Sequence, residues 1–377
     1  MQGAMDGRFL FRSEDSAPCN LATYSQGEFR MTRFRIALGA VIVLIVAVVV
    51  ITAVRPPMPP SVNGSASAQV YPVSQRAAAP GFTGIDAWIN SAPLTAASLR
   101  GKVVLVDFWT FSCINCVRTL PHLRQLYDTY RGRGFVIVGV HSPEFDFEKV
   151  LANVRQAVQR LAVTWPVAVD SQMATWNAFG NAYWPAEYLV DQQGRVAYTT
   201  IGEGNYAATD AAVGELLGVT RAGSPSATAV PTDITPELYA GSQRGQLVTG
   251  EAYGAPGSPL FYPDPGRPRD VDAIQVTGTW TDEAQYLRAD GTGHVRLNFH
   301  GDALYVVAGT SAGAIHVGVS LDGGPVPAGR SGSALSASAF DVGRHDLYPL
   351  LTGLGPGYHL IDLTVPAGFE LYTFTFG

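Results

Sequence analysis

The stretch Val103–Pro121, VVLVDFWTFSCINCVRTLP, decides the fold of this chain. Its first half is a run of apolar and β-branched residues interrupted by one acid, Asp107, and it predicts a buried strand over Val103–Phe108. The second half predicts a helix whose first turn presents Cys113, with Cys116 on the same helix face. The sequence therefore predicts a pair of thiols at the N-terminus of a helix that directly follows a buried strand.

This position makes Cys113 the expected nucleophile. The free N–H groups and the positive end of the helix dipole stabilise an anion at a helix N-terminus. Cys-X-X-Cys thiols at such positions have pKa values of roughly 3.5–7.5, against about 8.5 for a free cysteine. We expect Cys113 to form a mixed disulfide that Cys116 then resolves. Zinc sites share this cysteine spacing and are the alternative.

A second apolar strand is predicted over Phe135–Val140. Strand, helix and strand at this spacing predict a right-handed βαβ unit with parallel strands. Because parallel strands share a carboxyl edge, His141 and Glu144 are expected near the Cys113 loop. His141 is either a strand-end histidine bonded to local backbone or a polar contact beside the thiolate.

Further elements of this region are read from periodicity and turn residues. We expect a small hairpin from Ala87–Ile89 and Leu94–Ala96, helices over Phe147–Arg160 and Ala207–Leu217, and a strand after Pro185. An acid in a buried strand is costly without a partner or a task, so Asp107 is a candidate functional residue. Glu203 is a weaker candidate, because a solvated turn explains it equally well.

The run VDFWTFSCINC, with HSPEF downstream, resembles thioredoxin-like thiol:disulfide oxidoreductases of the DipZ/TlpA type. The resemblance implies an α/β thioredoxin-like fold over residues 81–219, with a redox-active Cys113–Cys116 disulfide and no other cofactor and no metal. It implies that Asp107 takes the proton of Cys116 and that Pro185 is cis. The substrate-binding residues that it implies are Trp109, Trp184, Pro185 and His141.

The N-terminal part predicts a membrane anchor. Residues 1–33 read as a cytoplasmic segment, 34–54 as a transmembrane helix and 55–80 as a Pro-, Ser- and Ala-rich linker. Arg30, Arg33 and Arg35 precede the apolar run, so the positive-inside bias places the remaining chain outside the cytoplasm, in the periplasmic or extracellular space. A signal peptide cleaved near Ala66-Ser67-Ala68, with Met31 as the start, is the alternative.

Beyond a second linker at 220–234, residues 235–377 predict an all-β sandwich of the jelly-roll kind. Short, partly alternating runs separated by turn residues, among them Ile315–Leu321 and Tyr358–Val365, carry this prediction. The order of a thioredoxin-like domain followed by a sandwich like a carbohydrate-binding module is again similar to DipZ. Trp280, Tyr286, Tyr262 and Tyr253 are candidates for stacking on sugars, or else belong to the core.

Composition narrows the function classes. The chain has 377 residues, a net charge of −6 and only three cysteines, so neither nucleic-acid binding nor a disulfide scaffold is expected. We expect a thiol:disulfide oxidoreductase acting on extracytoplasmic protein thiols and disulfides. Its expected electron-transfer partner is a membrane protein of the DsbD/CcdA type, and glycans are a further candidate partner.

Three alternatives stay open. A thiol peroxidase of the same fold normally has Pro and Thr shortly before the reactive cysteine, and Trp109-Thr110-Phe111-Ser112 lacks that arrangement. A copper-delivery protein would use soft thiolates with His141. A glycan or cell-wall docking module with a vestigial thioredoxin domain is the third.

Overall fold

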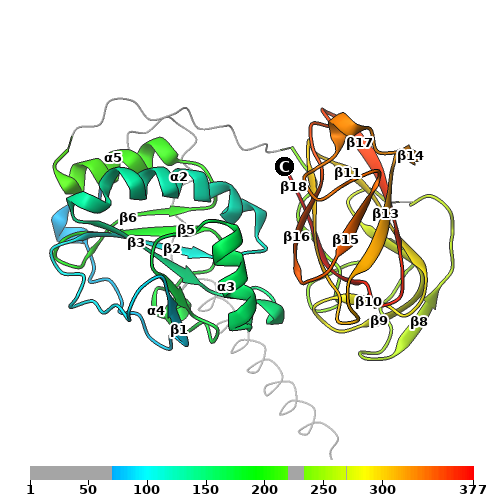
Figure 1. Ribbon diagram of the computed structural model, residues 1–377, viewed down its shortest axis with the longest axis horizontal. Helices are drawn as coiled ribbons and strands as arrows, with labels where there is room; N and C mark the ends of the chain where they lie inside the picture. Colours follow the sequence, from blue (N-terminus) through cyan, green and yellow to red (C-terminus); the bar gives the residue numbers. More distant parts are fainter. Residues whose placement is uncertain (1–69, 220–232, 269) are drawn as a thin grey trace, which may run out of the picture. The chain divides into compact units, whose positions relative to one another are not determined.

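The computed structural model describes residues 70–219, 233–268 and 270–377. Figure 1 shows two sheets, one flanked by helices and one without them. The first sheet is formed by residues up to 201 and the second by residues from 238 onward. The two regions thus correspond to two different fold classes.

The first sheet has six strands in the order β1-β4-β3-β2-β5-β6. The strands are β1 (Ala87–Ile89), β2 (Val103–Trp109), β3 (Phe135–His141), β4 (Val167–Val169), β5 (Ala186–Val190) and β6 (Val196–Ile201). Strands β2, β3 and β4 are parallel, whereas β5, β6 and β1 run antiparallel to their neighbours. The predicted βαβ unit is confirmed, and the topology is thioredoxin-like.

Helices cover both faces of this sheet (Figure 1). The helices are α2 (Ile114–Tyr130), α3 (Leu151–Arg160), α4 (Ala174–Ala178) and α5 (Tyr206–Leu217). Buried side chains of α2, α3 and α5 share one core with β2 and β3, while Trp176 of α4 belongs to the core on the opposite face. Because both faces are covered, all seven residues of β2 are buried.

Two local predictions were wrong. Strand β1 pairs with β4 and not with residues 94–96, so the expected hairpin does not exist. The helix expected over Phe147–Arg160 is divided into a 3₁₀ turn (Asp146–Lys149) and α3, because Val150 between them has an extended backbone. Three further 3₁₀ turns are Val73–Gln75, Arg131–Arg133 and Ala328–Arg330.

The second sheet has twelve strands. Its strands are β7 (Leu238–Tyr239), β8 (Pro259–Tyr262), β9 (Ile274–Asp282), β10 (Leu287–Ala289), β11 (Gly293–His300), β12 (Leu304–Gly309), β13 (Ile315–Leu321), β14 (Gly324–Pro325), β15 (Ala339–Val342), β16 (Asp346–Leu351), β17 (Tyr358–Val365) and β18 (Glu370–Phe376). The pairings described among them are antiparallel, so the all-β prediction is confirmed.

The sheet is one continuous curled sheet and not two separate layers. Residues 274–277 of β9 pair with β11, whereas 280–282 pair with β10. Gly278 lies between these halves with φ +92°, and a Cβ there would meet the carbonyl oxygen of Thr292 at 2.9 Å. Only glycine adopts this conformation without strain, so Gly278 lets one strand serve both halves of the sheet.

The candidate sugar-binding aromatics lie largely in the core. Trp280 and Tyr262 are buried, and the Trp280 indole donates to the carbonyl of Thr277 at 2.8 Å. Tyr286 stacks on Tyr372, and Tyr253 packs against the same core as Trp280. These four residues therefore form no common exposed face.

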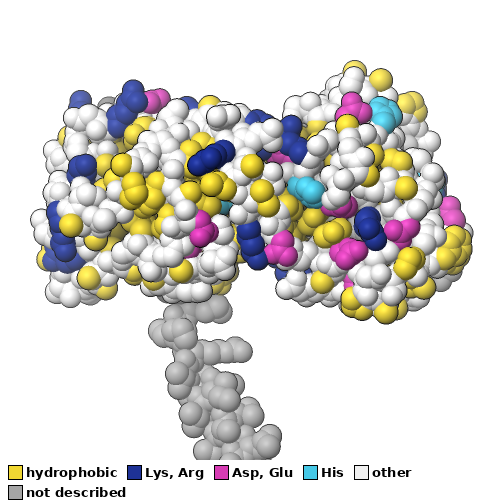
Figure 2. Space-filling view, turned by 60° about the horizontal axis from the view of Figure 1, so that its bottom comes forward, with side chains coloured by type: hydrophobic (Ala, Val, Ile, Leu, Met, Phe, Trp, Pro, Cys, Tyr) yellow, Lys and Arg dark blue, Asp and Glu magenta, His cyan; other side chains and the backbone are white. Residues whose placement is uncertain are grey.

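The predictions about surface charge and about a membrane span are compared with the structure in turn. Basic and acidic side chains are interspersed on the face drawn in Figure 2 and do not gather in one basic patch. Within the described ranges, no helix is both long and apolar enough for a membrane span. The predicted transmembrane segment 34–54 lies outside these ranges.

Candidate active site

The two thiols lie at the start of α2, just after the turn that follows β2. Cys113 is the N-cap of α2, with its carbonyl accepting the N–H of Val117 at 3.0 Å. Its side chain is partly exposed, whereas Cys116 is completely buried, and both are free thiols. Only Cys113 can therefore meet an incoming disulfide, and Cys116 can react only with a sulfur already attached to Cys113.

Cys116 and Asp107 form a buried pair of proton-carrying groups. Burial and the hydrogen bond with Cys113 raise the pKa of Cys116, and the negative charge of Asp107 raises it further. Burial and nearby Glu187 raise the pKa of Asp107 in turn. Neither carboxyl oxygen of Asp107 has a hydrogen-bond partner among the residues that the structure describes. A carboxyl group left unpaired beside a buried thiol is suited to exchange a proton with it.

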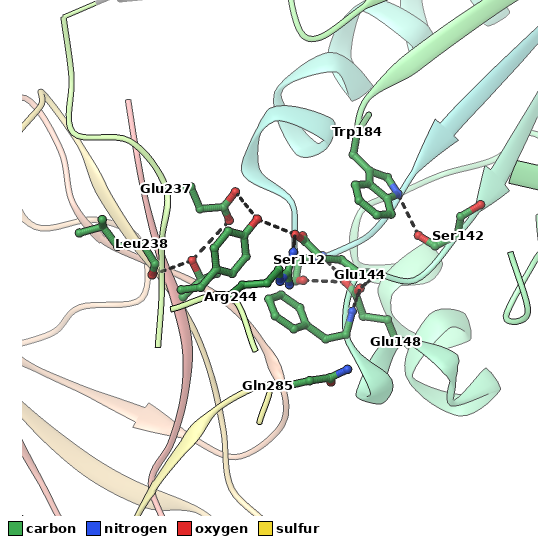
Figure 3. Close-up of polar contacts among 12 residues, drawn as sticks. Ser112, Ser142, Glu144, Glu148, Trp184, Glu237, Leu238, Arg244 and Gln285 are labelled. Carbon is green, nitrogen blue, oxygen red and sulfur yellow. Dashed lines mark hydrogen bonds and ion pairs between the residues drawn. The ribbon is translucent and has the colours of Figure 1, made fainter. Parts of the chain in front are cut away.

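Glu148 is a buried acid beside the thiols that the sequence did not single out. One of its oxygens accepts from the Ser112 hydroxyl at 2.6 Å and the Ser112 amide at 3.3 Å. The other accepts from the amides of Glu144 and Phe145 at 2.6 and 3.0 Å (Figure 3). This buried carboxylate thus ties the residue before Cys113 to the loop after β3. The available signal was an acid placed three residues after Phe145, at the start of a helical turn.

His141 and Trp109 are corrections to the predicted substrate-binding surface. His141 ends β3, is fully buried, and lies 3.3 Å from the Thr110 hydroxyl through Nε2. Burial lowers its pKa to about 3, so the ring is neutral at physiological pH. Trp109 is 1% exposed and packs at 5.4 Å edge-on to His141. Both rings thus lie in the core beneath the turn and expose almost no surface.

Trp184 and Pro185 lie on the other side of the turn. The Trp184–Pro185 peptide is cis, which confirms the prediction, and Pro185 itself is buried. The Trp184 indole donates to the carbonyl of Ser142 at 2.9 Å (Figure 3) and packs on Trp176 with ring centroids 4.2 Å apart. Tyr183, which was not predicted, is 58% exposed. Tyr183 is thus the exposed aromatic residue of this segment, and Trp184 beside it is partly exposed.

Glu144 connects the loop after β3 to the C-terminal domain. Its carboxylate accepts from the Tyr239 hydroxyl and from Arg244, both at 2.8 Å (Figure 3). Glu237 lies 2.9 Å from the same hydroxyl. These partners follow Glu144 by about a hundred positions, so no local pattern could predict them. Glu203, the weaker candidate, forms an ion pair with Arg118 at 3.1 Å.

A copper or zinc function needs a cluster of metal-ligating side chains. Over the described ranges, the structure contains no group of three or more His, Cys, Asp or Glu side chains arranged to hold a metal ion. His141 faces Thr110 and its ring contacts are with Phe111 and Trp109. The thiols therefore stand beside carboxyl groups and aromatic rings, a setting suited to proton and disulfide chemistry.

Comparison with known proteins follows the same division. Residues 75–217 match the family model described as Redoxin, and residues 235–377 match the one described as Thioredoxin like C-terminal domain. Protein DipZ of Mycobacterium tuberculosis (strain CDC 1551 / Oshkosh) is 35% identical over 315 residues, 79% of this chain and 43% of DipZ. This chain thus spans less than half the length of DipZ.

Two shorter relatives match one third of the chain. Thiol-disulfide oxidoreductase YkuV of Bacillus subtilis (strain 168) is 29% identical over 123 residues, which is 33% of this chain and 82% of YkuV. Thiol-disulfide oxidoreductase ResA of Bacillus thuringiensis (strain Al Hakam) is 28% identical over 125 residues, 33% of this chain and 68% of ResA.

Proposed function

We propose that this chain, which matches the Redoxin family model and is similar to thiol-disulfide oxidoreductases, exchanges disulfides with extracytoplasmic proteins through Cys113 and Cys116. One observation carries the proposal: a partly exposed Cys113 caps a helix directly above a fully buried Cys116 and Asp107. This arrangement separates a thiol that meets the client from one that acts only after the client is attached. No cofactor other than the Cys113–Cys116 disulfide takes part.

The chemistry follows from the positions of the two sulfurs. The Cys113 thiolate attacks one sulfur of a client disulfide, which releases the other client sulfur and leaves a mixed disulfide. Cys116 loses its proton to Asp107 and attacks Cys113, forming the Cys113–Cys116 bond and releasing the reduced client. Two enzyme thiols are oxidised to one disulfide as one client disulfide is reduced to two thiols. The reverse sequence oxidises a client dithiol.

We place the catalytic domain outside the cytoplasm on a single membrane anchor. The apolar segment 34–54, preceded by arginines, supports this proposal through its length and the positive-inside bias. The electron source is then a second membrane protein of the DsbD/CcdA type. Fusion of a disulfide-dependent reporter phosphatase after residue 80 tests the topology, since the reporter is active only outside the cytoplasm. An inactive reporter would contradict the anchor.

The decisive experiment on function measures the redox couple of the purified full chain. Equilibration with glutathione buffers, followed by acid quenching and mass analysis, gives the fraction of the Cys113–Cys116 disulfide at each potential. We expect one reversible two-electron couple between about −270 and −120 mV. Thiols that never join reversibly, or that hold zinc tightly, would overturn the proposed function.

A further inference from the structure

Glu187 of β5 is a second buried acid beside Asp107. The β2–β5 register pairs Asp107 directly with Glu187, and it pairs Leu105 with Leu189 two residues away on each strand. Directly opposed side chains of antiparallel strands lie on the same face, with Cβ atoms about 4.5–5.5 Å apart. Asp107 is completely buried and Glu187 is 4% exposed. The two carboxyl groups thus share one dry face of the sheet, the face covered by α2 and α5.

Two carboxylates in such a place cannot both be charged at low cost. Glu187 receives a hydrogen bond from the Thr209 hydroxyl at 3.4 Å. Asp107 has no such donor among the residues described. Burial raises the pKa of Glu187 to about 7, and the charge of Glu187 contributes to the raised pKa of Asp107. Near neutral pH the pair therefore carries a proton that either carboxyl group can hold.

A polar route continues from Glu187 on the helix side. His122 of α2 lies 3.0 Å from Asp210 of α5 through Nε2, and both side chains are buried. The His122 ring packs against half-buried Tyr206 at 4.5 Å. The polar groups that face Glu187 from the elements packed against it are Asp107 (β2), Tyr198 and Thr200 (β6), His122 (α2), and Tyr206, Thr209 and Asp210 (α5).

We propose that Glu187 is the second carboxyl group of the proton relay that serves Cys116, exchanging protons with Asp107 and passing them toward the His122–Asp210 pair. This inference rests on the proposed function and extends it from the thiols into the interior. Glu187 touches neither sulfur, so it is a positioning residue that acts through Asp107.

The protons and electrons of the relay balance without any added reactant. When Cys116 attacks Cys113, its proton goes to the Asp107 carboxylate, and the Cys113–Cys116 bond forms as the bond from Cys113 to the client breaks. The electron pair of that bond leaves with the client sulfur. The proton on Asp107 then moves to the Glu187 carboxylate and on toward His122 and Asp210, which restores Asp107 for the next turnover.

The test is the pH profile of disulfide formation in the full chain. Reduced protein is mixed with oxidised glutathione between pH 5 and 9, and the rate at which Cys116 resolves the glutathione adduct on Cys113 is followed by acid quenching and mass analysis. Asp107→Asn identifies the limb of the profile that belongs to Asp107. In Glu187→Gln, which keeps the side-chain shape, we expect that limb to move to lower pH by roughly one unit or more, because a neighbouring negative charge is gone.

Two further variants keep the test decisive. Glu215→Gln removes an exposed acid of α5 and is expected to leave the profile unchanged. Thr209→Val removes the hydrogen-bond donor to Glu187 and thereby favours the protonated, neutral form of Glu187. We expect this variant to move the limb in the same direction as Glu187→Gln, toward lower pH, but by less, which tests the proposal even if Glu187→Gln folds poorly.

The outcomes separate this inference from the proposed function. Suppose that Asp107→Asn changes the pH profile, whereas Glu187→Gln and Thr209→Val leave it in place. This result would overturn the role of Glu187, and the oxidoreductase function would stand. Loss of adduct formation at Cys113 in the unmodified chain would instead overturn the function itself.

Discussion

Asp107 and Glu148 are both fully buried acids of the redox domain, yet their surroundings are opposite. Glu148 accepts four hydrogen bonds, two from Ser112 and one each from the amides of Glu144 and Phe145. Asp107 accepts none from the part of the chain that the structure describes, and its negative charge raises the pKa of Cys116. A buried carboxylate with its donors in place holds a structure together, whereas one without donors can take and release a proton.

The two acids also differ in what surrounds them besides burial, and this difference affects their protonation. Burial and the charge of Glu144 raise the pKa of Glu148, and the hydrogen bonds from Ser112 and from the Phe145 amide offset part of that rise. For Asp107, nearby Glu187 acts in the same direction as burial. We therefore expect Glu148 to hold the shape of the turn before Cys113. We expect Asp107 to take part in the chemistry of Cys116.

The largest effect is expected at the thiols on which the comparison depends. Cys113→Ser should reduce disulfide exchange to background, because Cys116 is completely buried. Cys116→Ser should instead accumulate a glutathione adduct on Cys113 that is not resolved. Mass analysis after acid quenching distinguishes the two variants. Equal adduct formation in both would show that burial does not separate the roles of the two sulfurs.

Asp107→Asn is the next largest change. An amide cannot accept the proton of Cys116, so the resolving step should slow by about 10²–10⁴-fold, the usual contribution of a positioned general base. Rapid-mixing measurement of adduct decay checks this.

The Asp107→Asn variant should also lose a pH dependence of stability. A raised carboxyl pKa means that wild-type stability falls as pH rises through the folded pKa, and Asn removes that fall.

A matched experiment at Glu148 should give the reverse pattern. Glu148→Ala leaves the Glu144 and Phe145 amides and Ser112 without their acceptor, at a cost of about 1–3 kcal/mol for each unsatisfied buried group. Urea unfolding should show this loss, with Glu148→Gln in between because its amide keeps one acceptor oxygen. If Glu148→Gln slowed the resolving step as strongly as Asp107→Asn, the distinction between the two acids would be wrong.

His141 should give the smallest effect on activity. With a pKa lowered to about 3, its ring stays neutral from pH 5 to 8, so its NMR ring signals should not titrate in that range. The unfolded state takes up a proton near pH 6.5, and the native state does not, so His141 makes stability fall as pH drops from about 6.5 toward 3. His141→Gln should flatten that decline. A ring titrating near pH 6.5 would contradict its assignment to the core.

Much of the redox domain could be predicted from local sequence. The βαβ unit around Cys113 is visible because strand, turn and helix follow one another with their own periodicities. In the C-terminal domain, Ile315–Leu321 and Tyr358–Val365 alternate clearly enough that the expected and observed strand bounds coincide. Strand β9 was not predicted, since Gly278 and five polar residues interrupt the apolar pattern within Ile274–Asp282.

By itself, the sequence determined the two thiols, their helix N-terminus and the buried acid at position 107, since each depends on neighbours a few positions away. Only the tertiary structure decided which buried acid has hydrogen-bond donors and which has none among the described residues. Ser112 meets Glu148 across 36 positions, and Asp107 meets Glu187 through a strand register. Such contacts form when distant segments pack into one dry interior. There, the presence or absence of a single hydrogen-bond donor determines what a carboxyl group can do.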